Sequence, residues 1–323
     1  MIIRPSRLRH NLNIRTLTKE NDISLNDLVY PLFVIDGQNI KNPIESMPNI
    51  YQFSIDKLLF EIDELIDLNI KNILLFGIPN KKDDLGSDSF NKNGIVQKTI
   101  IEIKKRFPKL YIMTDVCFCE YTSHGHCGIL KNDHIDNDLT LKYLQKQALS
   151  QVQSGSDLIA PSSMTDGMVK SIRNILDKNN YINIPIMSYS AKYASSFYGP
   201  FRDAVKSAPK FGDRKMYQMD PSNSREAIKE VLIDIEEGAD IVMVKPALSY
   251  LDVICKIKDQ INIPLSSFNV SGEYSMIKAA AMNGWIDEDL VRDELLLSLK
   301  RAGSDIIISY FTKDFAKKKR NND

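Results

Sequence analysis

The sequence lacks net charge, because 42 lysines and arginines balance 42 aspartates and glutamates among its 323 residues. A chain without an overall field has no general attraction for nucleic acid or for an anionic membrane. It also has no run of about 18 apolar residues, and its start, MIIRPSRLRH, holds no apolar core of signal-peptide length. We therefore expect a soluble cytoplasmic protein with a local site and without nucleic-acid or membrane partners.

Cysteine is scarce, with four in the chain, and three of these, Cys117, Cys119 and Cys127, fall within eleven residues. In a reducing compartment such clustering indicates metal binding or catalysis rather than a disulfide framework, although a redox cluster and chance are alternatives. Three thiolates leave the fourth position of a tetrahedral zinc open for Lewis-acid chemistry. A fourth protein ligand would instead make the site structural, and the candidates are His124, His126 and Cys255.

Short β-rich runs alternate with segments whose apolar residues recur at helical spacing. One such helical stripe holds Leu58, Ile62, Leu65 and Ile66, and another holds Leu232 before the capping glycine Gly238. Eight alternating strands in one series predict an α/β protein with a single (β/α)8 TIM barrel, and a doubly wound open sheet is the alternative. The predicted strands are residues 28–35, 72–78, 110–116, 157–161, 184–190, 241–244, 264–270 and 305–310.

Two segments stand outside this alternation. Residues 1–25 are polar and basic without a clear period, and we interpret them as an extended N-terminal arm before a barrel domain of residues 26–323. Residues 195–221 contain glycines, prolines and several aromatic residues, and they are too long for an ordinary strand-to-helix loop. We interpret them as an active-site lid, with a disordered insertion as the alternative.

Two lysines end neighbouring predicted strands. Lys245 follows residues 241–244 and is stopped at once by Pro246, and Lys192 ends the run that begins at residue 184. Neighbouring strands lie about 4.8 Å apart, so two ammonium groups there repel and at least one shifts toward the neutral form. Neutral lysines in a covered pocket form Schiff bases with carbonyl compounds. The alternative is a lysine that reaches from the strand end into solvent.

Other polar residues fall at the carboxyl ends of the predicted strands, where barrel enzymes place their chemistry. These residues are Asp115, Cys117, Cys119, Ser162, Ser271 and Tyr310. Arg202 and Arg214 lie in the predicted lid, and arginine is the side chain that clamps a carboxylate with two hydrogen bonds. Gln218 adds a neutral donor, and the hydroxyls of Ser271 and Tyr310 are suited to a second carboxylate.

These residues together resemble the porphobilinogen synthase, or 5-aminolevulinate dehydratase, family. The similarity extends over essentially the whole chain, and the lysine signature GADIVMVKPALSY and the three-cysteine loop are each specific to it. The matching segments are residues 4–9, 30–34, 75–79, 115–128, 188–193, 238–250, 268–274 and 308–311.

The resemblance implies a lyase that condenses two molecules of 5-aminolevulinate into porphobilinogen, with loss of two waters, in haem synthesis. It implies that Lys245 forms the Schiff base with the substrate whose carboxylate meets Ser271 and Tyr310. Lys192 then binds the second substrate. The carboxylate of that substrate meets the lid residues Arg202, Arg214 and Gln218. The resemblance further implies a catalytic zinc on Cys117, Cys119 and Cys127, with Asp115 assisting proton transfer.

The resemblance also implies an activating magnesium at Glu230 and a homo-octamer in which the arm wraps a neighbouring subunit. Three positions depart from the pattern common in the family, namely Asn49, Gln52 and Met168, and none is expected to touch the chemistry. A Schiff-base aldolase of the same fold needs one lysine and no zinc, so the three cysteines argue against it. A zinc-binding scaffold protein leaves both lysines and the arginine-bearing lid unexplained.

Overall fold

The computed structural model describes residues 2–322, and the side chains of residues 2–321. Eight parallel strands form a nearly closed barrel in the order β8-β5-β4-β1-β12-β11-β10-β9. The remaining seam is bridged where the Ile159 N–H donates to the Pro185 carbonyl at 3.1 Å. The strands are β1 (Leu28–Ile35), β4 (Asn72–Ile78), β5 (Tyr111–Val116), β8 (Leu158–Pro161), β9 (Met187–Lys192), β10 (Ile241–Lys245), β11 (Leu265–Asn269) and β12 (Ile306–Ser309).

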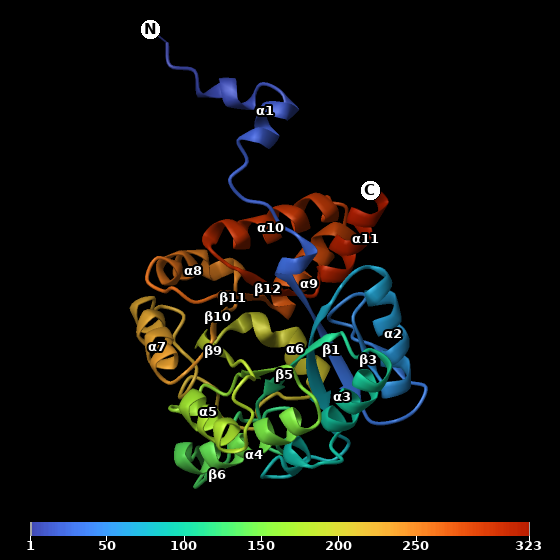
Figure 1. Cartoon of the computed structure of the whole chain (residues 1–323), viewed down its shortest axis with the longest axis vertical. Helices are drawn as coiled ribbons and strands as arrows, with labels where there is room; N and C mark the ends of the chain where they lie inside the picture. The colour runs from blue at the N-terminus through green and yellow to red at the C-terminus, as the bar shows by residue number, and fades with distance from the viewer. Residues whose placement is uncertain (1, 323) are drawn as a thin grey trace.

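The helices form a ring around the strands (Figure 1). Their ends follow local capping chemistry: α10 begins after Asp287, whose side chain accepts from the Leu290 N–H, and ends at Gly303 with a φ of 119°. The α-helices of the ring are α2 (Ile55–Asp67), α3 (Ile95–Arg106), α4 (Asn137–Gln153), α5 (Met168–Lys178), α7 (Arg225–Glu236), α8 (Leu251–Lys258), α9 (Ser271–Met282), α10 (Glu288–Ala302) and α11 (Thr312–Asn322). Short 3-10 turns occur at η2 (Leu25–Asp27), η3 (Ser87–Phe90) and η5 (Leu248–Tyr250).

The predicted barrel is confirmed, while several boundaries differ. The strand predicted at residues 184–190 runs as Met187–Lys192, and β10 likewise includes Lys245, so both lysines are the last residues of their strands. Ile66 and Leu232 were placed on buried faces but are 43% and 45% exposed, because each lies one residue beyond a buried position. The short strands β2 (Lys41–Pro43), β3 (Tyr51–Phe53), β6 (Leu130–Lys131) and β7 (His134–Ile135) are too brief to show a period in the sequence.

The N-terminal segment projects away from the barrel (Figure 1). It contains two short helical turns that the sequence pattern did not reveal, η1 (Pro5–Arg9) and α1 (Leu12–Leu17). Its apolar side chains Leu8, Leu12 and Leu17 are 56%, 67% and 82% exposed, so they bury little surface against their own chain.

The segment at residues 195–221 has structure of its own. It contains η4 (Ser196–Tyr198) and the helix α6 (Gly199–Val205), followed by an irregular stretch. The Phe201 N–H of α6 donates to the Ser271 hydroxyl at the start of α9, at 3.0 Å. This contact holds the segment against the barrel. It therefore argues against the alternative prediction that the segment is a disordered insertion.

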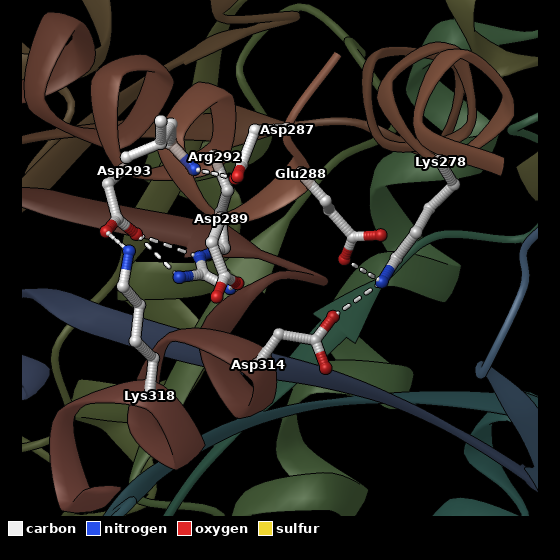
Figure 2. A network of polar contacts seen from close by, with 9 residues as sticks. Lys278, Asp287, Glu288, Asp289, Arg292, Asp293, Asp314 and Lys318 are labelled. Carbon is white, nitrogen blue, oxygen red and sulfur yellow. Dashed lines mark hydrogen bonds and ion pairs between the residues drawn. The ribbon is translucent and has the colours of Figure 1, made fainter. Parts of the chain in front are cut away.

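An ion-pair network fixes the last helix to the barrel (Figure 2). Lys278 of α9 is 4% exposed and pairs with Glu288 of α10 and, at 2.7 Å, with Asp314 of α11. The second centre is Arg292, 1% exposed, which pairs with Asp289 and Asp293, while Lys318 of α11 also pairs with Asp293. Because the two cations are buried, their carboxylate partners are needed to offset lost hydration. None of the described helices is long and apolar enough to cross a membrane.

Candidate active site

The two strand-end lysines face one another across neighbouring strands. Lys192 of β9 and Lys245 of β10 are backbone register partners, and both side chains are buried. They line one narrow cavity at the carboxyl ends of the strands, where barrel enzymes carry their sites. Its other lining residues are Phe76, Asp115, Cys119, Glu120, Ser162, Tyr198, Phe201 and Arg214.

Lys245 lies in an aromatic surrounding. Its Nζ is 4.2 Å from the ring centre of Phe268 and 4.9 Å from that of Tyr189. Burial and the neighbouring charge of Lys192 lower the pKa of Lys245 to about 7. A large fraction of this amine is therefore neutral and nucleophilic at neutral pH, as expected for one member of a repelling pair.

Lys192 has the opposite electrostatic environment. Its Nζ donates to the Ser162 carbonyl after β8. Burial alone would lower the pKa of Lys192, but the Cys127 thiolate, together with Cys117, Cys119 and Asp115, raises it above the usual value. The cavity thus holds one amine shifted toward neutrality beside one that remains an ammonium.

The three clustered cysteines converge on one point beside this cavity. The Sγ atoms of Cys117, Cys119 and Cys127 all lie within 4.8 Å of one another, and those of Cys117 and Cys119 are 3.5 Å apart. Sulfur atoms around a tetrahedral zinc with bonds near 2.3 Å are separated by about 3.8 Å. The spacing of the three sulfur atoms therefore fits a zinc ion, and Cys119 places the cluster at the wall of the lysine cavity.

The candidates for a fourth protein ligand are engaged or distant. His126 contacts the Tyr217 hydroxyl through Nδ1 at 3.2 Å and the Phe211 carbonyl through Nε2 at 3.1 Å. His124 accepts from the His126 N–H through Nδ1, and Cys255 lies exposed on α8. Among residues 2–321 the cysteine cluster contains three ligands, the number that leaves a zinc position open. A second group shares Cys117, because carboxylate oxygens of Asp115 and Glu120 lie within 4.8 Å of its Sγ.

Two carboxylates share the cavity. Asp115 of β5 is 7% exposed and Glu120 is 2% exposed, and each has an oxygen without a hydrogen-bond partner among the described side chains. Burial and the charge of Glu120 raise the pKa of Asp115 to about 7. Glu120 was part of the sequence motif but received no role, although an acidic residue directly after Cys119 was a signal for one.

Both predicted arginines lie in the segment of residues 195–221 that was predicted to be a lid. Arg214, 5% exposed, donates to the carbonyls of Gly125 and Ser207 at 2.9 and 2.6 Å, which links the lid to the cysteine loop. Arg202 is half-buried, and the Nε atoms of Arg202 and Arg214 have no partner among the described residues. Gln218 is 3% exposed and lines a second cavity rather than the one that holds the lysines, with neither amide atom paired within the described part of the chain.

The two predicted hydroxyl donors differ in their contacts. The Ser271 hydroxyl already bonds the lid backbone, accepting from the Phe201 N–H and donating to the Phe197 carbonyl at 3.3 Å. Tyr310, 1% exposed, has an unpaired hydroxyl among the described residues, and burial raises its pKa. Its ring stacks on Phe33 with 6.0 Å between ring centres, so the hydroxyl is held within the aromatic wall.

Glu230 lies apart from this centre, on α7, where it lines the second cavity. Burial and the charges of Asp234 and Asp166 raise its pKa. Within the described residues, Glu230 is not part of a group of three ligands within 4.8 Å of one another. A cation at this position would need water or another chain to complete its coordination.

Two barrel side chains hold the end of lid helix α6. Lys82, after β4, donates to the carbonyls of Val205 and Lys206 at 3.1 and 2.8 Å, and Gln52 of β3 donates to the Ala204 carbonyl. These carbonyls are the acceptors that a helix leaves free at its carboxyl end. Gln52 does not line the lysine cavity, but the pairing of β3 with β1 brings it to the carboxyl end of α6.

The comparisons with known proteins agree with this geometry. The sequence model of the family described as "Delta-aminolevulinic acid dehydratase" matches residues 2–318. The chain is 54% identical over 319 residues to the enzyme of that name from Synechocystis sp., covering 98% of each, and 51% identical over 314 residues to that from Bacillus subtilis, covering 97% of each. A solved delta-aminolevulinic acid dehydratase (porphobilinogen synthase) from Toxoplasma gondii, in complex with its product porphobilinogen, has a TM-score of 0.96 and 43% identity, covering 98% of this chain and 91% of that one. The chain therefore belongs to the delta-aminolevulinic acid dehydratase family of lyases.

Proposed function

We propose that this chain condenses two molecules of 5-aminolevulinate into porphobilinogen, with loss of two waters, in cytoplasmic haem biosynthesis. The observation that carries the proposal is the register pairing of Lys192 and Lys245 in one cavity, with the pKa of Lys245 lowered to about 7. Two adjacent lysines match a reaction that must hold two ketone substrates side by side.

Lys245 forms the first Schiff base. Its neutral amine adds to the ketone carbon of one substrate, a carbon–nitrogen bond forms, and the ketone oxygen leaves as water. A protonated imine needs one proton beyond those of the amine, and Asp115 can supply it because its pKa is about 7. Asp115 is then a carboxylate beside Lys192, whose ammonium it faces. It can take up the Lys192 proton so that Lys192 binds the second substrate.

The carboxylates of the two substrates take different partners. The substrate on Lys245 extends toward the hydroxyls of Ser271 and Tyr310, and the substrate on Lys192 extends toward Arg202, Arg214 and Gln218. The unpaired donor atoms of the arginines, Gln218 and Tyr310 support this assignment, because buried donors without acceptors are suited to a ligand. Binding both carboxylates fixes the ketone carbons near their lysines.

Cys117, Cys119 and Cys127 would hold a catalytic zinc, which would supply Lewis-acid chemistry to the second substrate. Glu230 takes part in a separate magnesium site outside the active cavity. The N-terminal arm docks on a neighbouring subunit of a homo-octamer, and its exposed Leu8, Leu12 and Leu17 support a role in contacts between chains.

Porphobilinogen formation from 5-aminolevulinate, followed colorimetrically, tests the function. Activity should fall with a zinc chelator and return with zinc, and Lys245→Met should abolish turnover while the zinc content stays unchanged. Appreciable turnover in Lys245→Met would contradict the Schiff-base role. Family membership removes the aldolase and scaffold alternatives, so this experiment tests the roles of residues rather than the class of enzyme.

A further inference from the structure

Glu273, in the first turn of α9, is a fully buried carboxylate that the scheme above does not use. Its Oε1 atom accepts from the N–H groups of Ala247 and Leu248 at 3.2 and 2.7 Å. Its Oε2 atom accepts from the Asn269 side-chain amide at 2.8 Å and from the Val270 N–H at 3.0 Å. Each oxygen of this carboxylate therefore holds two donors.

These four donors determine the chemical form of the side chain. All of them are N–H groups, so a carboxylate satisfies all four, whereas the NH₂ group of an amide would face two donors without an acceptor. Burial raises the pKa of Glu273 to about 7, and the four hydrogen bonds act against that rise. The amino terminus of α9 also stabilises a negative charge in its first turn. Glutamine is therefore not a neutral replacement for Glu273.

The contacts of Glu273 join the ends of two neighbouring strands. Ala247 and Leu248 lie in the loop that follows Lys245, the last residue of β10, and β10 pairs with β11. Asn269 is the last residue of β11, directly before the start of α9. One carboxylate thus holds the backbone that leads away from Lys245 against the amino terminus of α9.

A second link continues from Asn269 to β12. The Ser309 hydroxyl donates to the Asn269 Oδ1 atom at 2.9 Å, and the two residues are register partners. The Phe311 N–H donates to the Ser309 hydroxyl at 3.1 Å. Tyr310 lies between Ser309 and Phe311 in the chain, so the network that begins at Glu273 fixes the backbone on both sides of Tyr310.

The network therefore reaches three residues with one assigned task. Lys245, Ser271 and Tyr310 are assigned above to the same 5-aminolevulinate molecule, and Ser271 directly follows Val270 at the start of α9. We propose that Glu273 is the positioning residue that keeps these three side chains aligned; this assignment rests on the proposed function. Glu273 acts through the backbone of β10, β11 and β12 and not through contact with the substrate.

The other half of the site has different supports. The Lys192 Nζ donates to the Ser162 carbonyl, and the Lys192 carbonyl accepts from the Met219 N–H at 3.1 Å. The cysteine cluster follows β5, on the far side of the barrel from β10, β11 and their loops. A change at Glu273 should therefore disturb the Lys245 half of the site and leave the cysteine cluster intact.

Levulinate, which has the ketone and the carboxylate of 5-aminolevulinate but no amine, tests the Lys245 half without turnover. The parent is compared with Glu273→Gln, with Asn269→Ala and with the control Glu61→Gln. Glu61 of α2 is 7% exposed and pairs with Lys313 of α11, so the control also removes a buried carboxylate, but outside the network.

Each protein is titrated with levulinate, the imine is trapped by borohydride, and mass spectrometry quantifies the adduct on Lys245. The urea midpoint of unfolding and the zinc content are measured on the same samples. These two measurements separate a loss of alignment from a general loss of stability.

Glu273→Gln should raise the half-saturating concentration of levulinate at least about tenfold, because the lysine and the carboxylate donors lose their alignment. Asn269→Ala, which removes one donor and the link to β12, should raise it at least about threefold. Glu61→Gln should stay within about twofold of the parent even where its urea midpoint falls, and all variants should keep their zinc.

Parent-like titrations in Glu273→Gln and Asn269→Ala would overturn the assignment, and so would equal weakening in Glu61→Gln or loss of zinc. If Glu273→Gln does not fold, the titration of Asn269→Ala decides between the same outcomes. A parent enzyme that forms no adduct on Lys245 would overturn the proposed function together with this assignment, and the parent sample alone would show it.

Discussion

Lys192 and Lys245 are register partners on adjacent strands, yet their pKa values shift in opposite directions. Both amines are buried, and burial lowers the pKa of each. The difference arises from their neighbours, because Lys192 is close to the Cys127 thiolate and the rest of the cysteine cluster, while Lys245 is close to Lys192 and aromatic rings. The pair therefore provides one nucleophilic amine and one cation from the same residue type.

The first prediction concerns the pH dependence of Schiff-base formation at Lys245. With a pKa of about 7, the neutral fraction of Lys245 rises from about a tenth at pH 6 to about nine-tenths at pH 8. Adduct formation with levulinate, trapped by cyanoborohydride and quantified on Lys245, should rise over this interval. Lys192→Met removes the repelling charge, so the pKa of Lys245 should increase and the profile should move to higher pH. An unshifted profile would show that Lys192 does not set the Lys245 pKa.

The second prediction concerns the attachment of the lid. Lys82→Met removes both hydrogen bonds to the end of α6, which is expected to loosen the lid by about 1–3 kcal/mol. We expect faster tryptic cleavage at Lys206 and Lys210 and a higher KM for 5-aminolevulinate. The neighbouring exposed residue gives the control Lys81→Met, which should behave like the parent. Identical cleavage rates in the two variants would show that the Lys82 hydrogen bonds do not hold the end of α6 in place.

The third prediction concerns the metal. Cys127→Ser should lower the zinc retained after dialysis against a moderate chelator, because the serine hydroxyl replaces a thiolate of the three-ligand cluster. Cys255→Ser should retain zinc like the parent, since Cys255 is exposed on α8. Elemental analysis of the dialysed proteins provides the measurement. Full zinc retention in Cys127→Ser would locate the metal elsewhere.

The fourth prediction concerns the ion-pair network of Figure 2. Arg292→Met removes a buried guanidinium and leaves Asp289 and Asp293 without it, although both carboxylates are partly exposed. We expect a loss of about 1–3 kcal/mol in the free energy of unfolding, discounted for that exposure. Urea titration followed by circular dichroism measures the midpoint. The exposed Arg301→Met on the same helix should shift it by less than about 0.5 kcal/mol, and an equal shift in both would argue against the network.

Local chemistry in the sequence was enough to predict the architecture. Runs that are apolar on both faces, alternating with helical stripes, define a parallel sheet covered by helices, and their number and spacing indicate a barrel. The cysteine spacing and the strand-end positions of Lys192 and Lys245 were visible for the same reason, since each depends on residues close in the chain. The prediction of buried helix faces was wrong at Ile66 and Leu232, because a step of one residue along a helix decides whether a side chain is buried or exposed.

The contacts between distant segments were decided by the tertiary structure alone. Closure of the barrel brings Gln52 and Lys82 to the lid helix more than a hundred residues away in sequence. It also brings Lys192 close to the cysteine cluster and Lys245 close to aromatic rings, which no local pattern specifies. The sequence by itself determined which residues can act as nucleophiles, acids or metal ligands, because residue type and strand position are local properties. The fold determined their protonation and partners, because electrostatic and packing interactions depend on distance in space.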